Sequence, residues 1–132
     1  MRIFKNRWFS RFTRKEGISD QALYKAVTQI EDGNYDADLG SGVFKHRIAR
    51  DGEGQSGGYR VILCFKAGTR TFFVYGFAKS DRANMTRSET REFKKLAKIL
   101  FSMTDQQLES MMQHGDFEEL CRKGGCGRDE DL

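Results

Sequence analysis

The chain has 132 residues and a mass of 15.2 kDa, a length that suits one domain and is too short for two. Hydrophobic residues make up 38% of it and 11 residues are phenylalanines, so the chain can bury a core and is not disordered throughout. Residues 1–104 carry 20 Lys and Arg against 11 Asp and Glu, whereas residues 105–132 carry 3 against 8, and a basic body of this kind favours nucleic acid as a partner.

The first third of the chain predicts a short strand at residues 2–4 and then two amphipathic helices. The first helix begins near residue 6 and ends at Gly17, with Trp8, Phe9 and Phe12 at helical spacing. The second follows Ser19, a good N-cap, and ends near Gly33. Its apolar stripe has the spacing of one helix face and comprises Leu23, Ala26, Val27 and Ile30.

Alternation of apolar and polar residues predicts three strands between residues 43 and 78, after a turn-rich connection at residues 34–42. In the first strand, His46 falls on the apolar face, whereas Lys45 and Arg47 fall on the other face. A glycine-rich loop at residues 51–58 and a short turn join the strands, so we expect antiparallel neighbours.

Two helices are expected after the strands, and each begins with a capping box. One box runs from Thr86 to Glu89 and the other from Thr104 to Gln107, and the second helix covers about residues 104–113. The pattern fades after Gly115. We therefore expect an α+β domain at residues 1–115, with two N-terminal helices packed on a mainly antiparallel sheet of about four strands and with C-terminal helices, followed by an acidic, disordered tail at residues 116–132.

The three cysteines do not form a disulfide framework. Cys64 lies in an apolar run and is expected in the core, whereas Cys121 and Cys126 lack the further ligands that zinc needs. Residues 1–12 lack the apolar segment of a signal peptide, and no apolar run reaches the length that spans a membrane. We expect a cytoplasmic protein with no metal, no cofactor and no membrane contact.

Positive charges on and beside the expected sheet are candidates for binding phosphate groups. Arg60 is the sharpest case, because it opens a strand rich in buried residues, where a guanidinium would present a fixed fork of donors. A salt bridge at the strand end is the alternative for Arg60, and a solvent-exposed face is the alternative for its neighbours. The candidates are Lys45, Arg47, Arg50, Arg60, Lys79 and Arg82.

Other kinds of catalytic site are disfavoured. His46 and His114 are the only histidines, and His46 lies on the apolar face, so a ribonuclease that uses a histidine pair is not expected. The loop at residues 51–58 lacks the Gly-Lys-Ser/Thr ending of a phosphate-binding P-loop, and it is either a flexible connection or a place where nucleic acid approaches the backbone. Any RNA cleavage would depend on positioning the phosphate and on cationic stabilisation.

The chain resembles the RelE/ParE superfamily of toxins from type II toxin–antitoxin systems, and its glycine-rich loop is most similar to the HigB-like branch. The resemblance covers about residues 2–101. It rests on the basic strand, on Ser-Gly-Gly-Tyr-Arg at residues 56–60 and on Gly-Phe-Ala-Lys-Ser-Asp-Arg at residues 76–82. It implies a RelE-like fold and a metal-free, ribosome-dependent endoribonuclease that cuts mRNA with the RNA 2′-hydroxyl as nucleophile. It also implies a cognate antitoxin, with operator DNA bound only through the antitoxin complex.

The resemblance implies roles for single residues. Arg60 would hold the scissile phosphate, Lys79 or Arg82 would stabilise developing charge, and Lys45 or Arg47 would assist proton transfer or contact ribosomal RNA. Further RNA-binding candidates are Arg50, Gln55, Ser56, Tyr59, Lys94 and Lys98.

The chain departs from the family pattern at two positions. Ser80 stands where RelE has a catalytic arginine, and Thr86 stands where it has a functional tyrosine. Two alternatives therefore stay open. A ParE-like toxin would inhibit DNA gyrase and would not need the cationic residues of the sheet, and an inactive relative would bind only antitoxin and nucleic acid.

Overall fold

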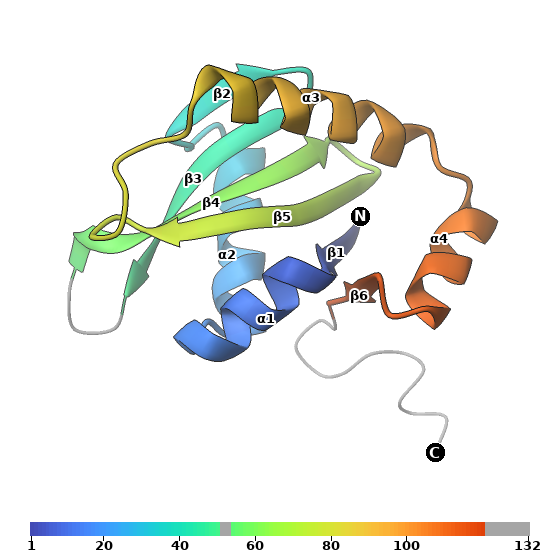
Figure 1. Ribbon diagram of the computed structural model, residues 1–132, viewed down its shortest axis with the longest axis horizontal. Coiled ribbons are helices and arrows are strands. Elements are labelled where there is room, and N and C mark those ends of the chain that lie inside the picture. The colour runs from blue at the N-terminus through green and yellow to red at the C-terminus, as the bar shows by residue number, and fades with distance from the viewer. Residues whose placement is uncertain (51–53, 121–132) are drawn as a thin grey trace.

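The computed structural model describes residues 1–50 and 54–120, and the side chains of residue 50 and of residues 54–57 are outside this description. Four helices and six strands lie within the described residues (Figure 1). The strands are β1 (Arg2–Asn6), β2 (Ala37–Gly40), β3 (Val43–Arg50), β4 (Gly54–Lys66), β5 (Arg70–Ala78) and β6 (Phe117–Glu119). The helices are α1 (Arg7–Glu16), α2 (Asp20–Glu31), α3 (Arg87–Ser102) and α4 (Asp105–Gln113).

The strands form one sheet in the order β2-β3-β4-β5-β1-β6. Strands β3, β4 and β5 are antiparallel neighbours, as the short connections predicted. Strand β1 pairs parallel with β5, where Arg2 is opposite Arg70, and antiparallel with β6 on its other side. The α+β class and the mainly antiparallel sheet are therefore confirmed, and the described sheet has two strands more than we expected.

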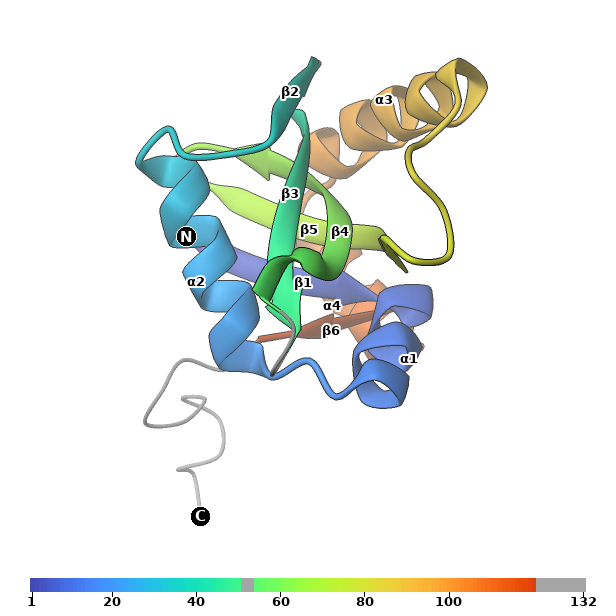
Figure 2. The same cartoon turned by 90° about the vertical axis from the view of Figure 1, so that its left-hand side faces the viewer.

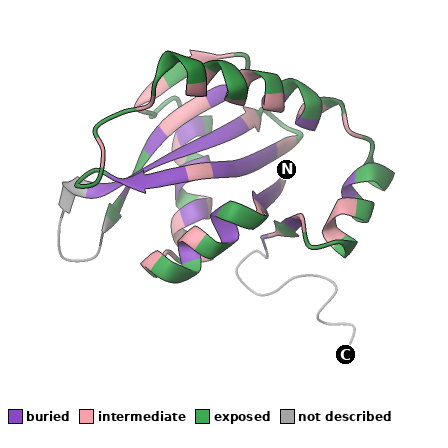
Figure 3. Cartoon of the chain, in the orientation of Figure 1, coloured by how far each residue is buried: buried purple, intermediate pink, exposed green. Residues whose placement is uncertain are grey.

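Helices cover both faces of the sheet, with α1 and α2 on one face and α3 on the other (Figure 2). Successive residues of a strand point to opposite faces, so Ile3 joins the core under α1 and α2, whereas Phe4 joins the core under α3 and α4. The middle strands are buried along most of their length (Figure 3). Both faces are apolar along most of the sheet because helices cover both of them.

The helices begin where the sequence predicted. The side chain of Asn6 accepts the N–H of Phe9 at 2.8 Å, and Gly17 ends α1 with a φ of 73°. Thr86 and Thr104 each form the predicted capping box, which satisfies the first free N–H groups of α3 and α4. None of the helices in the described chain combines the length and the apolar character that crossing a membrane would require.

Three segments differ from the expectation. Strand β2 lies in the turn-rich connection, and β4 begins at Gly54, so part of the glycine-rich loop is strand. Strand β6 lies in the segment where we expected an acidic tail to begin, and Leu120 after it is buried, with its N–H donating to the carbonyl of Ile3 at 2.8 Å. Residues 121–132, with Cys121 and Cys126, lie outside the described residues.

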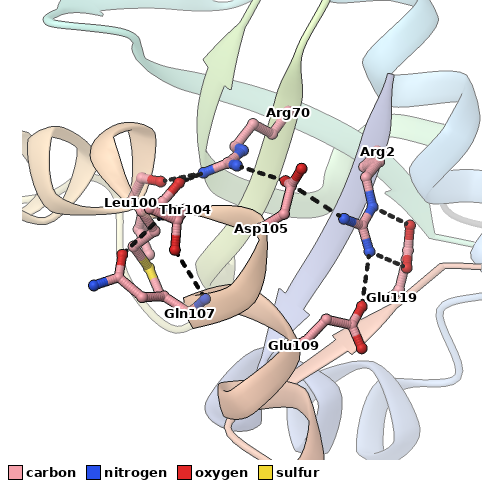
Figure 4. Close-up of polar contacts among 9 residues, drawn as sticks. Arg2, Arg70, Leu100, Thr104, Asp105, Gln107, Glu109 and Glu119 are labelled. Carbon is pink, nitrogen blue, oxygen red and sulfur yellow. Dashed lines mark hydrogen bonds and ion pairs between the residues drawn. The ribbon is translucent and has the colours of Figure 1, made fainter.

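Two arginines tie the C-terminal elements to the sheet (Figure 4). Nη1 of Arg70 donates to the carbonyl oxygens of Leu100 and Met103, at 3.1 and 2.6 Å, at the C-terminal end of α3. The guanidinium of Arg2 forms two hydrogen bonds with the carboxylate of Glu119, at 3.0 and 2.9 Å. The Arg70 contacts hold the end of α3 beside β5, and the Arg2 contacts hold β6 beside β1.

Candidate functional site

Four predicted cationic residues lie on and beside neighbouring parts of β3, β4 and β5, and we call Lys45, Arg47, Arg60 and Arg82 the cationic cluster. Arg47 of β3 is opposite Arg60 of β4, and Arg60 is opposite Phe77 of β5. The guanidinium carbon of Arg82 lies 5.2 Å from the centre of the Phe77 ring. The strand register therefore places these groups side by side.

Asp36, in the connection before β2, joins two members of the cluster. Its Oδ1 lies 3.0 Å from Nε of Arg47, and its Oδ2 lies 3.2 Å from Nε of Arg60. Arg60 is only 8% exposed, so its charge needs this partner in the free protein. The salt bridge that we considered for Arg60 is present, and it holds the guanidinium at the surface of the sheet.

Glu89 neutralises Arg82 in a similar way. Nη1 and Nη2 of Arg82 donate to the two carboxylate oxygens at 3.1 and 2.6 Å, and Nη1 also donates to the hydroxyl of Tyr75 at 3.2 Å. The bonds to Glu89 and then to Tyr75 raise the pKa of Arg82, and the bonds from Arg82 and from the backbone of Thr86 lower the pKa of Glu89 to about 2. Both groups are charged at neutral pH.

Asn84 links Lys45 to Arg82. Its side-chain oxygen accepts Nζ of Lys45 at 3.2 Å, and its backbone carbonyl accepts Nε of Arg82 at 3.0 Å. Lys79 follows β5 with an exposed side chain, and its backbone N–H donates to the carbonyl of Gly58 at 3.1 Å. The five residues that we predicted as catalytic therefore lie around the C-terminal end of β5.

The other predicted RNA-binding residues do not join this group. Tyr59 is buried on the opposite face, where its hydroxyl donates to Oε1 of Glu16 at 3.0 Å. Lys94 and Lys98 lie with Lys66 around a separate hollow of about 590 Å³, near the turn between β2 and β3. The side chains of Arg50, Gln55 and Ser56 lie outside the described residues.

Gly58 has a packing role that neither interpretation of the loop included. A Cβ atom at this position would lie 2.2 Å from the carbonyl oxygen of Ile48, so only glycine lets β4 approach β3 this closely. The pairing of the two strands is irregular between Ile48 and Arg50. Gly58 precedes Tyr59 and Arg60, and it therefore helps to place the arginine.

His46 is buried, as predicted, at 6% exposure. Its Nε2–H donates to Oε1 of Gln29 in α2 at 2.7 Å, and its buried Nδ1 has no hydrogen-bond partner among the described residues. Burial is the main cause that lowers the pKa of His46, with a raising contribution from Asp36 and a lowering one from Arg47. In the described part of the chain, no group of His, Cys, Asp or Glu side chains is placed to hold a metal ion.

Sequence reasoning missed the carboxylates of the site. Asp36 carries no periodic signal, because it lies between a helix and a four-residue strand that was not predicted. Glu89 was recognised as a capping residue, but its second contact depends on the path of the chain after β5. Together the cluster combines four cations with two carboxylates, an arrangement that can hold a phosphate if the phosphate displaces a carboxylate.

A family model for the RelE toxin of the RelE/RelB toxin–antitoxin system matches residues 1–120. No curated protein matches the chain. The chain belongs to the RelE toxin family, so it is the toxin of a toxin–antitoxin system. The toxins of this family generally cleave mRNA, and an antitoxin is the expected partner of the chain. The resemblance found in the sequence is confirmed at the level of the superfamily, and the HigB-like branch stays a prediction.

Proposed function

We propose that this toxin is a ribosome-dependent endoribonuclease that cleaves mRNA without a metal ion and so stops translation. The observation that carries the proposal is the buried, fixed guanidinium of Arg60 beside Arg47, with Arg82 across the ring of Phe77. Fixed arginines suit a phosphate that must be held in one geometry, because each presents a planar set of donors.

In this mechanism the 2′-hydroxyl of a ribose attacks the adjacent phosphate, and the 5′-oxygen of the next nucleotide leaves. Arg60 binds the phosphate, and Arg82 or Lys79 stabilises the negative charge that grows in the pentacovalent transition state. Lys45 or Arg47 takes part in proton transfer or contacts ribosomal RNA. Arg82 lies close to the place of the arginine that Ser80 replaces, and it is our candidate for that role.

The carboxylates support the dependence on the ribosome. Asp36 and Glu89 pair with Arg47, Arg60 and Arg82 in the free chain, so a free RNA must compete with charges that are already in contact. A ribosome that presents the mRNA in a fixed position lowers the entropic cost of that exchange. Free RNA should therefore be a poor substrate.

Reconstituted translation with a defined mRNA tests the proposal. New RNA 5′ ends within codons, mapped by primer extension, are expected with ribosomes and not with mRNA alone. Arg60→Ala should lower the cleavage rate by about 100- to 1,000-fold, the usual loss for one charge-stabilising donor. Arg14→Ala is the matched control, because Arg14 is exposed on α1. Translation arrest without new 5′ ends would overturn the proposal.

A second variant separates folding from chemistry. Arg60→Lys keeps the charge but loses the planar fork, so it should fold and cleave at an intermediate rate. Circular dichroism of each variant shows whether the sheet is retained. Equal cleavage by the wild-type chain, Arg60→Lys and Arg60→Ala would remove Arg60 from the site and leave the family assignment unchanged.

The proposal extends to partners and place. The antitoxin would cover the cationic cluster, and operator DNA would be bound only by the toxin–antitoxin complex. A toxin that acts on translating ribosomes would work in the cytoplasm. Co-purification with the product of a neighbouring gene, and loss of mRNA cleavage when that product is added, are the corresponding measurements.

A further inference from the structure

A cavity of about 510 Å³ lies between α2 and β3, and it shares Asp36 and Arg47 with the surroundings of the cationic cluster. The described pairing of β2 with β3 ends at Lys45, so the cavity opens at the part of β3 that follows. Its volume lies in the range of small-molecule sites. Lys25, Gln29, Tyr35 and His46 also line it.

The side-chain amide of Gln29 lines the cavity, and a hydrogen bond from His46 fixes its orientation. The buried ring of His46 donates Nε2–H to Oε1 of Gln29 at 2.7 Å. This bond occupies the side-chain oxygen of Gln29. The NH2 group of Gln29 has no hydrogen-bond partner among the described residues. The carboxylate of Asp36 also lines the cavity, but its two oxygens are paired with Arg47 and Arg60. With Lys25 and Arg47, the remaining lining therefore offers more hydrogen-bond donors than acceptors.

Tyr35 adds an aromatic surface to the same cavity. It is 40% exposed, although its ring packs against Phe44 with 5.0 Å between the ring centres and 72° between the ring planes. A ring that is held on one side and open on the other is a platform on which a flat base can stack. Tyr35 thus supplies the apolar part of a site whose remaining lining donates hydrogen bonds.

We propose that this cavity takes one nucleobase of the RNA, guanine in preference to adenine, while the adjoining phosphate contacts Arg47. The inference rests on the proposed function, since the RNA brings the base to this place. Guanine presents two acceptors, O6 and N7, on one edge, whereas adenine replaces O6 with an amino group that donates. Lys25 and the NH2 group of Gln29 are donors that match the guanine edge.

Titration of isotopically labelled protein with free nucleotides tests this without ribosomes. GMP should shift the amide resonances of Gln29, Tyr35 and His46 and bind at least about five-fold more tightly than AMP, the lower end of the discrimination that one two-acceptor edge provides. Ribose 5-phosphate, which lacks the base, should not shift the resonances of Gln29 and Tyr35. Equal affinity for GMP and AMP, or the same shifts with ribose 5-phosphate, would overturn the inference.

Two variants probe the cavity itself. Ala22→Leu fills it from α2 and should weaken GMP binding by about ten-fold or more, whereas Ala67→Leu, in the exposed turn between β4 and β5, should leave binding unchanged. Tyr35→Ala removes an exposed ring, so it threatens the fold little, and it should weaken binding by at least about five-fold through lost stacking. Unchanged affinity in both cavity variants would overturn the site.

The outcomes separate this inference from the proposed function. Normal cleavage of mRNA together with no GMP-induced shifts at Gln29, Tyr35 and His46 overturns the base site alone. GMP-induced shifts in a chain that cleaves no mRNA on ribosomes overturn the proposed function and support the base site.

Discussion

Arg82 and Glu89 contact each other through two parallel hydrogen bonds, at 3.1 and 2.6 Å. Oε1 of Glu89, which accepts the shorter of these bonds, also accepts the N–H of Thr86 at 2.8 Å and so completes the capping box of α3. One carboxylate therefore fixes both the start of a helix and the position of a cluster cation.

Replacing Glu89 by Gln should free Arg82 and leave the helix in place. Glutamine can still accept the N–H of Thr86, so α3 keeps its cap, but the charge opposite Arg82 is gone. We expect RNA affinity to rise several-fold, measured by fluorescence anisotropy with a short RNA at two salt concentrations. Glu92→Gln is the control, because Glu92 pairs with Lys95 away from the cluster. No gain over that control would show that Glu89 does not compete with RNA.

Replacing Asp36 by Asn should lower the stability of the fold and raise its affinity for RNA. The buried Arg60 loses its charged partner, so the free energy of unfolding should fall by roughly 1–3 kcal/mol in urea titrations. Arg47 becomes free for phosphate, so RNA affinity should rise. Asp38→Asn is the matched control, since Asp38 is exposed and accepts the N–H of Gly40. A variant as stable as this control would mean that Arg60 needs no carboxylate.

Gly58→Ala should be one of the most damaging small substitutions in the chain. The new methyl group would lie against the carbonyl oxygen of Ile48, and the strands would have to separate. We expect a loss of about 2–3 kcal/mol in the free energy of unfolding, and lower cleavage because Arg60 moves. Gly33→Ala is the comparison, because a Cβ there has open space and the cost of about 1–2 kcal/mol comes only from its positive φ. Equal losses would contradict the packing role.

The fold should lose stability as the pH falls below about 6.5, the ordinary pKa of histidine. Burial holds the pKa of His46 below that value, so the unfolded chain takes up a proton first and the unfolded state gains. Gln29 of α2 accepts the Nε2–H of the ring, the charges of Asp36 and Arg47 act on it, and Lys25 of α2 lines the same cavity. The loss should continue down to the lowered pKa and then level off.

Urea unfolding at pH 7.5 and at intervals down to pH 5 measures this dependence. His46→Asn should show a smaller loss over this range than the wild-type chain, whereas His114→Asn, an exposed substitution at the end of α4, should keep the wild-type loss. An identical pH dependence in the wild-type chain and His46→Asn would show that another group causes it.

Local signals in the sequence predicted the helices and the long strands, because caps and periodicity are set by neighbouring residues. Ser19, Thr86 and Thr104 cap helices as expected, and the strand parity that separated Lys45 and Arg47 from His46 is correct. Strands β2 and β6 were missed, since four and three residues are too short to show alternation. Their pairing depends on β3 and β1, which lie far away in the sequence or across a turn.

The cations of the candidate site could be predicted, whereas their partners could not. Arg60 stands out because a charge in a buried strand needs a reason, and this is visible in the sequence. Its partner Asp36 is visible only in three dimensions, and so is the contact of Arg82 with Tyr75. Residues that act through a buried or a surface ion pair carry no pattern of their own.

The place of β1 in the sheet has a consequence for how the toxin is made. This first strand lies between β5 and β6, and β6 is the last strand of the described chain. During synthesis, β1 is therefore made first but can pair with β5 and β6 only after those strands have been made. Contacts between segments that are so distant in the sequence form late in folding. Strand β1 can therefore complete its pairing only when the chain has been made as far as residue 119, close to the end of the described residues.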